Sequence, residues 1–319
     1  MNRIDLESLD LICKKFTVAG ARLISARTGG LINDTYLLNA DNKMYVIQRI
    51  NKNMDRDRLL FNYGLYSKAF DEADWLYPKW MKSNEGKYFV TDEAGDNWRM
   101  YPFVKCELLD KKLSKDYLFA IGEGLARMHK IFDLMEDKPK AVYPDLHDLN
   151  HYFDKYDRVL NGEGLLSENR DGVLEKEIDS NREKMLGIKT DKDSVIHADT
   201  KLSNILFVKG KVAGTIDMDT IMSGSVLEDI ADCIRSSSVN NGFYDKDAAE
   251  TIIKGYVSNT YKDKKEIIEG FPFVFEKICF ELALRYYTDS ISEEKYFKET
   301  YPGYCRERAK SLLGLVKNV

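Results

Sequence analysis

The sequence predicts an α+β fold with two lobes, a small N-terminal lobe around an antiparallel sheet and a larger, mainly helical C-terminal lobe. Short β-rich runs separated by turn signals dominate the chain before residue 104, and long helical patterns dominate after it. A linker that contains a proline separates the two regions. At 319 residues the chain is longer than most single-core domains, so we expect the lobes to comprise residues 1–104 and 105–319.

The N-terminal lobe begins with a short amphipathic helix over residues 6–16, because apolar side chains recur there at helical spacing. Strands at 23–26, 35–39 and 44–50 follow, and the turn signals between them predict an antiparallel meander. The first turn contains two adjacent glycines. Glycines leave backbone N–H groups accessible to an anion, although a two-glycine turn is also common in hairpins that bind nothing.

Two further strands, at 87–91 and 98–104, complete the predicted sheet, and a helix over residues 117–132 opens the C-terminal lobe. We expect His129 on this helix to be a buried structural histidine. In the loop that follows, His147 is not predicted to bind a metal, because the other histidine nearby gives only a helical i, i+4 pair with it.

The most informative segment joins short apolar strands. Residues 195–204 read VIHADTKLSN, and an apolar hairpin then leads to residues 214–219, which read GTIDMD. This order should bring Asp199, Asn204 and Asp217 together. Taken singly, each is also typical of a polar loop before a hairpin, and the flanking strands favour the functional interpretation.

The residue types in this segment suit phosphoryl transfer, which requires positioning and charge neutralisation more than covalent catalysis. Asp199 would orient an acceptor hydroxyl and accept its proton, and Lys201 would reach the transferring phosphate as a compact charge. Asn204 and Asp217 offer the oxygen ligands that Mg²⁺ prefers. The sequence therefore predicts a kinase that uses ATP and Mg²⁺.

The N-terminal lobe would hold the nucleotide. On the third strand, alternation places Val46 and Gln48 on one face, so Val46 would cover the adenine. Gln48 stands where protein kinases carry lysine. Either Gln48 or Arg49, through a bulge, would reach the phosphates, and a solvated Arg49 is an equal alternative. Backbone groups of the linker would bind the adenine edge. The predicted nucleotide set is Gly29, Gly30, Asn33, Val46, Gln48, Arg49, Tyr101 and Phe103.

The C-terminal lobe continues as helices to the end of the chain. Asp229 and Asp232 would either brace the catalytic loop by accepting its backbone N–H groups or favour their own helix N-terminus through its dipole. Residues 271–273, Phe-Pro-Phe, predict a break between helices. Arg285 is conspicuous on a buried helix, and we expect it to pair with Asp289 one turn further on.

Composition argues against several classes of protein. Lys and Arg number 48 against 53 Asp and Glu, a formal net charge of -5, which is unlike a nucleic-acid-binding protein. The five cysteines are scattered and lack the spacing of a zinc site or a disulfide framework. No run approaches the roughly 20 apolar residues of a membrane span, and the N-terminus lacks the apolar core of a signal peptide. We expect a soluble cytoplasmic protein whose partners are small molecules, not nucleic acid or membrane.

Several segments resemble a known family. HADTKLSN followed by IDMDT is similar to the motifs of the aminoglycoside phosphotransferase and choline kinase superfamily, whose fold resembles that of protein kinases. GGLINDTYLL, YVIQRIN, GTIDMDTIMSGSVLEDIADCIR and LRYYTDSISEEKYF resemble the N-acetylhexosamine 1-kinase branch, and they are spread over most of the chain.

The resemblance implies ATP-dependent, in-line phosphorylation of the anomeric hydroxyl of an N-acetylhexosamine in the presence of Mg²⁺. It implies that Asp199 is the base, that Asn204 and Asp217 bind the metal, and that Arg285 and Tyr296 contact the sugar. Glutamine on the third strand is usual in this branch, so Gln48 departs from protein kinases alone.

Other acceptors and another class of function remain open. The same core serves choline, homoserine or aminoglycosides in other kinases; choline would require an aromatic cage and an aminoglycoside many acids, and Arg285 favours neither cation. Gln48 by itself would also suit a nucleotide-binding regulator without turnover. The intact Asp199, Asn204 and Asp217 argue against a regulator.

Overall fold

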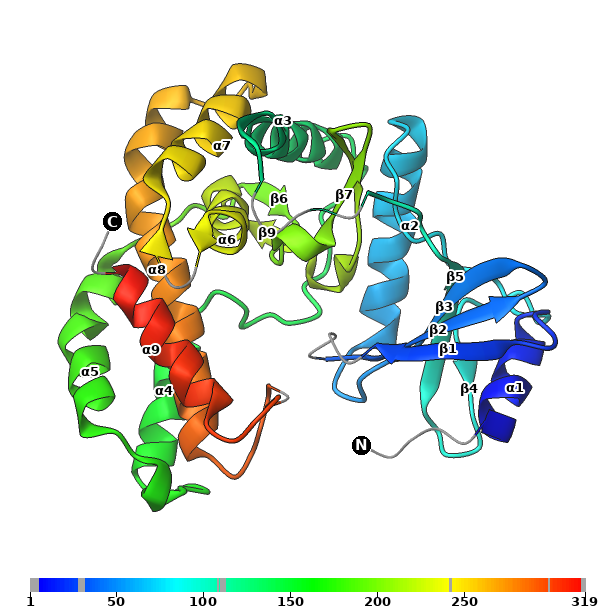
Figure 1. Ribbon diagram of the computed structural model, residues 1–319, viewed down its shortest axis with the longest axis horizontal. Coiled ribbons are helices and arrows are strands. Elements are labelled where there is room, and N and C mark those ends of the chain that lie inside the picture. The colour runs from blue at the N-terminus through cyan, green and yellow to red at the C-terminus, as the bar shows by residue number, and fades with distance from the viewer. Residues whose placement is uncertain are drawn as a thin grey trace.

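The computed structural model describes residues 6–27, 32–107, 109, 113–240, 243–297 and 299–316. It confirms the predicted α+β class, with a kinase-like arrangement of an antiparallel sheet lobe and a helical lobe (Figure 1). Within the described residues, no helix is both long and apolar enough to cross a bilayer.

The sheet lobe contains five antiparallel strands in the order β1-β2-β3-β5-β4. Its own core includes Phe16, Leu38, Ile47, Trp98 and Met100, all nearly inaccessible to solvent. The predicted helix and first three strands are confirmed, whereas the predicted strand at 87–91 shrinks to two residues. The elements are α1 Leu6–Lys15, β1 Arg22–Arg27, β2 Asp34–Ala40, β3 Lys43–Arg49, β4 Val90–Thr91 and β5 Asn97–Pro102.

Helix α2, Arg56–Glu72, lies between the sheet and the helical lobe (Figure 1). Its buried side belongs to the large core that continues into the helical lobe, not to the core of the sheet. Just after α2, the Trp75 indole N–H donates to the Thr215 hydroxyl at 3.1 Å, and Leu76 forms a bridge with Gly214. Residues 75–76, which precede β4 and β5 in the sequence, therefore already contact the strands of the predicted catalytic segment.

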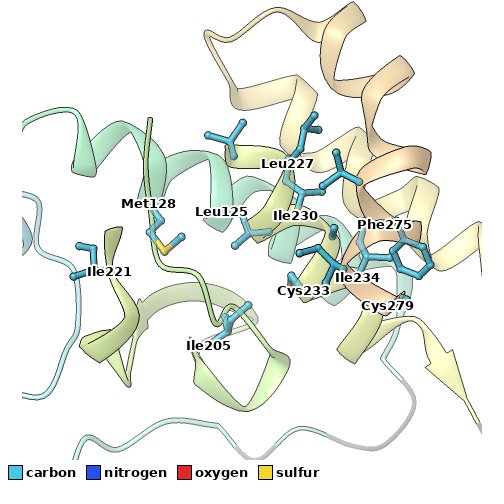
Figure 2. Packing of buried hydrophobic residues seen from close by; sticks show 14 of the residues in the cluster. Leu125, Met128, Ile205, Ile221, Leu227, Ile230, Cys233, Ile234, Phe275 and Cys279 are labelled. Carbon is cyan, nitrogen blue, oxygen red and sulfur yellow. The ribbon is translucent and has the colours of Figure 1, made fainter. Parts of the chain in front are cut away.

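The helical lobe surrounds two small antiparallel pairs of strands, β6 with β9 and β7 with β8, that carry the predicted catalytic segment. Figure 2 shows Leu227, Ile230 and Ile234 of α6 packing among neighbouring helices. The elements are α3 Lys115–Phe132, α4 Leu149–Leu160, α5 Gly172–Gly187, β6 Ser194–Ile196, β7 Ile205–Val208, β8 Lys211–Thr215, β9 Met222–Gly224, α6 Val226–Ser237, β10 Val239–Asn240, β11 Phe243–Tyr244, α7 Lys246–Asn259, α8 Lys264–Ile291 and α9 Tyr304–Val316, with 3₁₀ turns at Ser167–Asn169, Leu202–Asn204 and Met218–Thr220.

The predicted break at residues 271–273 is wrong, because α8 continues through Pro272. Proline removes one helical hydrogen bond. Here Phe271, Val274 and Phe275 are buried on one side of the helix, while Phe273 is 57% exposed. Tertiary burial of that apolar side outweighs the local cost of the proline.

Helices α3 and α7 cross with their backbones in close contact at two glycines. A Cβ atom on Gly122 would lie 2.0 Å from the Ile252 carbonyl oxygen, and one on Gly255 would lie 2.2 Å from the Phe119 carbonyl oxygen. The side chain of any other residue would push the helices apart. This crossing supports His129 of α3, which is central to the candidate site.

Candidate active site

The structure brings the predicted catalytic residues together on one loop. The Lys201 ammonium lies 2.5 Å from Asp199 Oδ2, and the Asn204 amide donates to the same oxygen at 3.1 Å. The Asn204 amide also donates to the backbone carbonyl of Asp199 at 2.9 Å. Burial opposes the charge of Lys201, but Asp199 and Asp217 raise its pKa. The loop thus fixes a carboxylate between a cation and an amide.

Asp217 follows β8 in a left-handed conformation, with φ 64° and ψ 50°. The preceding residue ties it to the catalytic loop, because the Ile216 N–H donates to the Asn204 carbonyl at 2.9 Å and its carbonyl lies 2.9 Å from His197 Nε2. Asp217 is exposed to solvent as a residue, although other groups crowd its carboxyl group. Desolvation, followed by the negative charges of Asp219 and Asp199, raises its pKa to about 6.

Asp229 of α6 holds the catalytic loop through hydrogen bonds to its backbone. Its two carboxylate oxygens accept the backbone N–H groups of His197 and Ala198 at 2.9 and 2.8 Å, and its carbonyl accepts the Thr200 hydroxyl. His129 Nε2 lies 3.0 Å from the same carboxylate. Complete burial opposes the charge, but His129 and these N–H groups hold the pKa of Asp229 below its usual value. Of the two alternatives for Asp229, the structure supports bracing of the loop over the simpler helix-dipole account, and His129 is buried as predicted.

The N-terminus of α6 is capped by residues other than Asp229, and Asp232 pairs within its own helix. Ser225 and Glu228 form the capping box of α6, so Asp229 is free to serve the loop. Asp232 contacts the Arg235 guanidinium at 2.7 and 3.0 Å. The prediction that Asp232 braces the loop is therefore wrong, because its own helix supplies a cation one turn away.

A buried network that the sequence did not reveal joins the sheet lobe to the catalytic segment. The Arg99 guanidinium of β5 donates to both oxygens of Asp219 at 2.6 Å, and the Asn33 amide donates to Asp219 at 3.0 Å. Arg99 Nε also donates to Gln48 at 2.9 Å, and the guanidinium stacks over the Trp80 ring. Desolvation opposes the charge of Arg99, and Asp219 raises its pKa. The positive charge that protein kinases carry on the third strand is thus present here on β5, the strand paired with β3, as Arg99.

Two features of the sequence could have pointed to this network. Arg99 is a charge between apolar residues of a strand, and Asp219 is a second acid two residues after Asp217. Pairing of β3 with β5 places Arg99 directly opposite Gln48. Only that register identifies Arg99 as the partner of Gln48, because the two residues are far apart in sequence.

The structure argues against Arg49 as a phosphate ligand. Arg49 lies opposite Trp98, on the other face of β3 from Gln48, and no bulge is present between β3 and β5. Its guanidinium contacts Asp34 at 2.5 Å and Asp96 at 3.3 Å. Regular strand alternation explains the correction, because the local twist that would turn Arg49 inward is absent from the described ladder.

The other predicted nucleotide residues have mixed placements. Val46 and Gln48 are buried on the same strand, as predicted, and Tyr101 pairs with Val46 across β3 and β5. The Phe103 N–H donates to the Met44 carbonyl at 2.9 Å, so it is not available to an adenine edge. Gly29 and Gly30 lie outside the described residues.

Arg285 of α8 lies among aromatic rings. Its guanidinium carbon is 4.8 Å from the Tyr152 ring centroid, 5.1 Å from Tyr296 and 5.4 Å from Phe297. Arg285 also donates to Glu281 at 3.4 Å. The structure therefore brings Arg285 and Tyr296 together, as the sequence predicted.

The predicted pairing of Arg285 with Asp289 is wrong. Asp289 is 2% exposed, and its carboxylate accepts the backbone N–H groups of Tyr296 and Phe297 at 2.7 and 2.6 Å. Asp289 thus holds the segment after α8 against Arg285. Arg285 instead pairs with Glu281, four residues earlier on the same helix, because the Asp289 carboxylate is occupied by these amides.

The donor set suits Mg²⁺, although no three His, Cys, Asp or Glu side chains of the described chain converge as a metal cluster. Magnesium typically takes one or two protein oxygens together with substrate phosphates and water. Asp217 and Asn204 offer such oxygens, and the N–H of Ile216, directly before Asp217, donates to the Asn204 carbonyl. Desolvation and then the negative charges of Asp219 and Asp199 raise the pKa of Asp217, and a bound cation would neutralise part of that negative charge.

Comparisons with known proteins support the family. A model of the phosphotransferase enzyme family matches residues 24–257. A microcompartment-associated aminopropanol kinase is 16% identical, with 97% of this chain and 95% of that chain covered at a TM-score of 0.71. A choline kinase from Streptococcus pneumoniae is 15% identical, with 98% and 100% covered at a TM-score of 0.64.

A third structure, an amicoumacin kinase in complex with AMP-PNP, Ca²⁺ and Ami, is 13% identical, with 92% and 87% covered at a TM-score of 0.64. At these identities the three structures establish a common fold. The family model extends from β1 to α7 and spans the catalytic loop, Arg99 and Asp217. This chain therefore belongs to the phosphotransferase enzyme family.

Proposed function

We propose that the protein is an ATP-dependent small-molecule kinase that phosphorylates the anomeric hydroxyl of an N-acetylhexosamine. The observation that carries the kinase assignment is the fixed Asp199 carboxylate, held by Lys201 and Asn204 on a loop that Asp229 braces. Family membership and neighbours named as kinases of small molecules support it. The hexosamine assignment rests on the resemblance of the third strand and the C-terminal segment.

In this mechanism Asp199 orients the acceptor hydroxyl and receives its proton. Both of its contacts with Lys201 and Asn204 are made through Oδ2, so Oδ1 would face the acceptor. Lys201 would then neutralise charge on the transferring phosphoryl group as the acceptor oxygen attacks in line. Because the loop is preorganised, this geometry costs little reorganisation at the moment of transfer.

Arg99 takes the place of the lysine that protein kinases carry on the third strand. It is a buried cation held against Gln48 and Asp219, so its position is fixed relative to the catalytic segment. We assign it to the nucleotide side of the site. Asn204 and Asp217 would hold Mg²⁺, which when bound neutralises phosphate charge and orients the ATP.

The acceptor side favours a sugar over choline. A quaternary ammonium binds by stacking on several aromatic faces. Around α8, the Tyr152, Tyr296 and Phe297 rings already hold the Arg285 guanidinium. Arg285 and the tyrosine hydroxyls instead offer hydrogen-bond donors to neutral oxygens, as a sugar with an acetamido group would require.

A panel of acceptors tests the proposal. The protein is incubated with MgATP and, separately, N-acetylglucosamine, N-acetylgalactosamine, glucose, homoserine, choline and an aminoglycoside, and ADP release is measured. We expect turnover with the two N-acetylhexosamines, with ³¹P–¹³C NMR locating the phosphate on C1. Turnover with choline or the aminoglycoside alone would refute the sugar assignment but retain the kinase. ATP binding without ADP release for any acceptor would favour a regulator.

A further inference from the structure

The segment between α3 and α4 lies against the catalytic loop. Leu146 is 8% exposed and packs with Ile196, Ala198 and Met222 in a small core of its own, and Tyr143 is packed against the same core. Ile196 ends β6, directly before the loop that carries Asp199. The segment is therefore positioned as a wall of the candidate site, although it contains none of its predicted residues.

Two polar atoms in this segment are buried without a partner. Neither the Tyr143 hydroxyl nor His147 Nε2 has a hydrogen-bond partner among the described residues, and both atoms are inaccessible to solvent. Burying an unpaired polar group destabilises the folded chain, and proteins rarely retain one without a use for it. Two such atoms four residues apart thus need an explanation.

The surroundings of both groups point to the acceptor. His147 Nδ1 lies 3.1 Å from Glu281 Oε2, and Arg285 contacts the other oxygen of the same carboxylate. The Tyr143 hydroxyl is close enough to Tyr296, Asp219 and Asp217 for their charges, after burial itself, to raise its pKa. Tyr143 is therefore near both the proposed metal ligand Asp217 and the proposed acceptor residue Tyr296.

We propose that the Tyr143 hydroxyl and His147 Nε2 are hydrogen-bonding groups of the acceptor site, and that this site selects an uncharged or anionic acceptor over a cationic one. This inference rests on the proposed kinase function. It adds two specificity-determining residues to Arg285 and Tyr296, and it names a class of acceptor by charge, on grounds independent of the resemblance to sugar kinases.

The charge balance around Glu281 carries the second half of the proposal. Burial opposes protonation of His147, but Glu281 raises its pKa to about 9, so the ring is an imidazolium at neutral pH and Nε2 is a donor. Glu281 thus faces two cations, His147 and Arg285. Each of its two oxygens contacts one of these cations.

The other acids nearby are occupied as well. Asp289, a second buried acid near Arg285, accepts the Tyr296 and Phe297 N–H groups. Glu228 lies 3.7 Å from Lys277, and Asp232 contacts Arg235 at 2.7 Å. An ammonium group entering beside His147 and Arg285 would meet two cations and carboxylates that already have partners, whereas hydroxyl, amide carbonyl or carboxylate oxygens would receive the His147 and Tyr143 hydrogens.

Tyr143→Phe is the sharpest test, because it removes one hydroxyl and keeps the ring. With the acceptor that gives the highest turnover in the panel, we expect its KM to rise about tenfold, with the KM for ATP unchanged, as loss of one hydrogen bond predicts. Tyr156→Phe is the matched control, because the Tyr156 hydroxyl is also buried and unpartnered but faces α5 and α8. An acceptor KM for Tyr143→Phe equal to that of the control would overturn the proposal.

Thermal unfolding supplies a second readout that needs no substrate. If the Tyr143 hydroxyl is unpaired in the free protein, Tyr143→Phe should unfold at the same or a higher temperature than the parent. A clearly lower midpoint would mean that the hydroxyl has a structural partner, and would overturn its role in the acceptor site. Addition of the best acceptor should raise the midpoint of the parent more than that of the variant.

His147→Gln tests the charge. We expect it to weaken discrimination, so that the ratio of kcat/KM for N-acetylglucosamine to that for choline falls at least tenfold. His151→Gln is the control, because His151 is 43% exposed and its contact is with Asp145 at the surface. Parent protein that prefers choline or an aminoglycoside would overturn the charge class while sparing the kinase. Failure of all phosphorylation with ATP bound would instead reject the proposed function.

Discussion

The Asp199 carboxylate is fixed before any substrate arrives, since Oδ2 already contacts both Lys201 and Asn204. A general base positioned in this way acts on the acceptor hydroxyl without paying for its own orientation. The same contacts explain why a conservative substitution there should be informative. The amide of asparagine has a similar shape but cannot accept a proton.

Asp199→Asn should retain the fold and lose turnover by about 10²–10⁴-fold, the usual contribution of a positioned general base. Because Arg99 and Asp217 are untouched, the dissociation constant for MgATP should change little. Steady-state kcat and calorimetric nucleotide binding measure the two effects. The exposed Asp191→Asn, in the loop before β6, is the control. Turnover equal to that of the parent would reject Asp199 as the base.

His147 predicts a pH dependence of stability. Its folded-state pKa is raised from the ordinary value of 6.5 to about 9, chiefly by Glu281 of α8, with Glu228 and Asp232 of α6 adding to the effect. A raised pKa means that the protonated ring stabilises the fold below pH 6.5, and that this stabilisation is lost as the pH rises toward 9.

The midpoint of thermal unfolding should therefore fall between pH 6.5 and 9 by more in the parent than in His147→Gln. Differential scanning calorimetry at several pH values measures this difference. The His151→Gln control should follow the parent, because His151 is half exposed. Parallel curves for the parent and His147→Gln would show that His147 is neutral at pH 7.

At the scale of elements, the α3 and α7 crossing depends on two glycines. Gly255→Ala should destabilise the protein by about 1–3 kcal/mol, because the new Cβ would meet the Phe119 carbonyl oxygen and the helices would have to separate. Gly64→Ala on α2 is the matched control, because nothing lies within 4 Å of its Cβ position. That control should gain about 0.5–1 kcal/mol. Urea unfolding gives both values, and equal values for the two variants would contradict the crossing.

Helical periodicity and turn signals predicted most elements, because they are local properties. The helix over residues 117–132 and the hairpin before Asp217 agree with α3, β7 and β8. Tertiary packing decided the rest. The break expected at Pro272 is absent because α8 buries its apolar side on both sides of the proline.

The candidate site likewise has a part that local sequence predicts and a part that only the tertiary structure shows. Asp199, Lys201, Asn204 and Asp217 lie within one short segment, so their grouping could be predicted from spacing. Arg99, Gln48 and Asp219 come from three segments and meet only through the register of β3 with β5. The sequence left open whether Gln48 or Arg49 faces the helical lobe for the same reason, because the face of a strand that meets that lobe is a property of the whole sheet.

At the scale of the molecule, a buried ion pair spans the two lobes. Arg99 is 3% and Asp219 5% exposed, and each would be an uncompensated charge without the other. Breaking such a pair by removing one partner typically costs about 3–5 kcal/mol. Arg99 and Asp219 therefore set how the sheet lobe sits on the helical lobe.

Asp219→Ala should lower the free energy of unfolding by about 3–5 kcal/mol and weaken MgATP binding, because Arg99 loses the partner that positions it. Chemical denaturation and nucleotide titration measure the two effects. Glu163→Ala is the control, because its contact with Arg158 is at the surface, where an ion pair contributes about 0–1 kcal/mol. Equal losses in the two variants would remove the pair as a link between the lobes.

The same ion pair limits how this chain can be recombined with its relatives. A chimera that takes the sheet lobe from one enzyme and the helical lobe from another would separate Arg99 from Asp219. If the donor of the helical lobe lacked an acid at that position, the hybrid would carry an orphaned guanidinium at its lobe junction. Lobe exchange should therefore give a functional enzyme only when both parents carry the arginine and the acid at the positions of Arg99 and Asp219. The residues at these two positions thus decide which parents can be recombined.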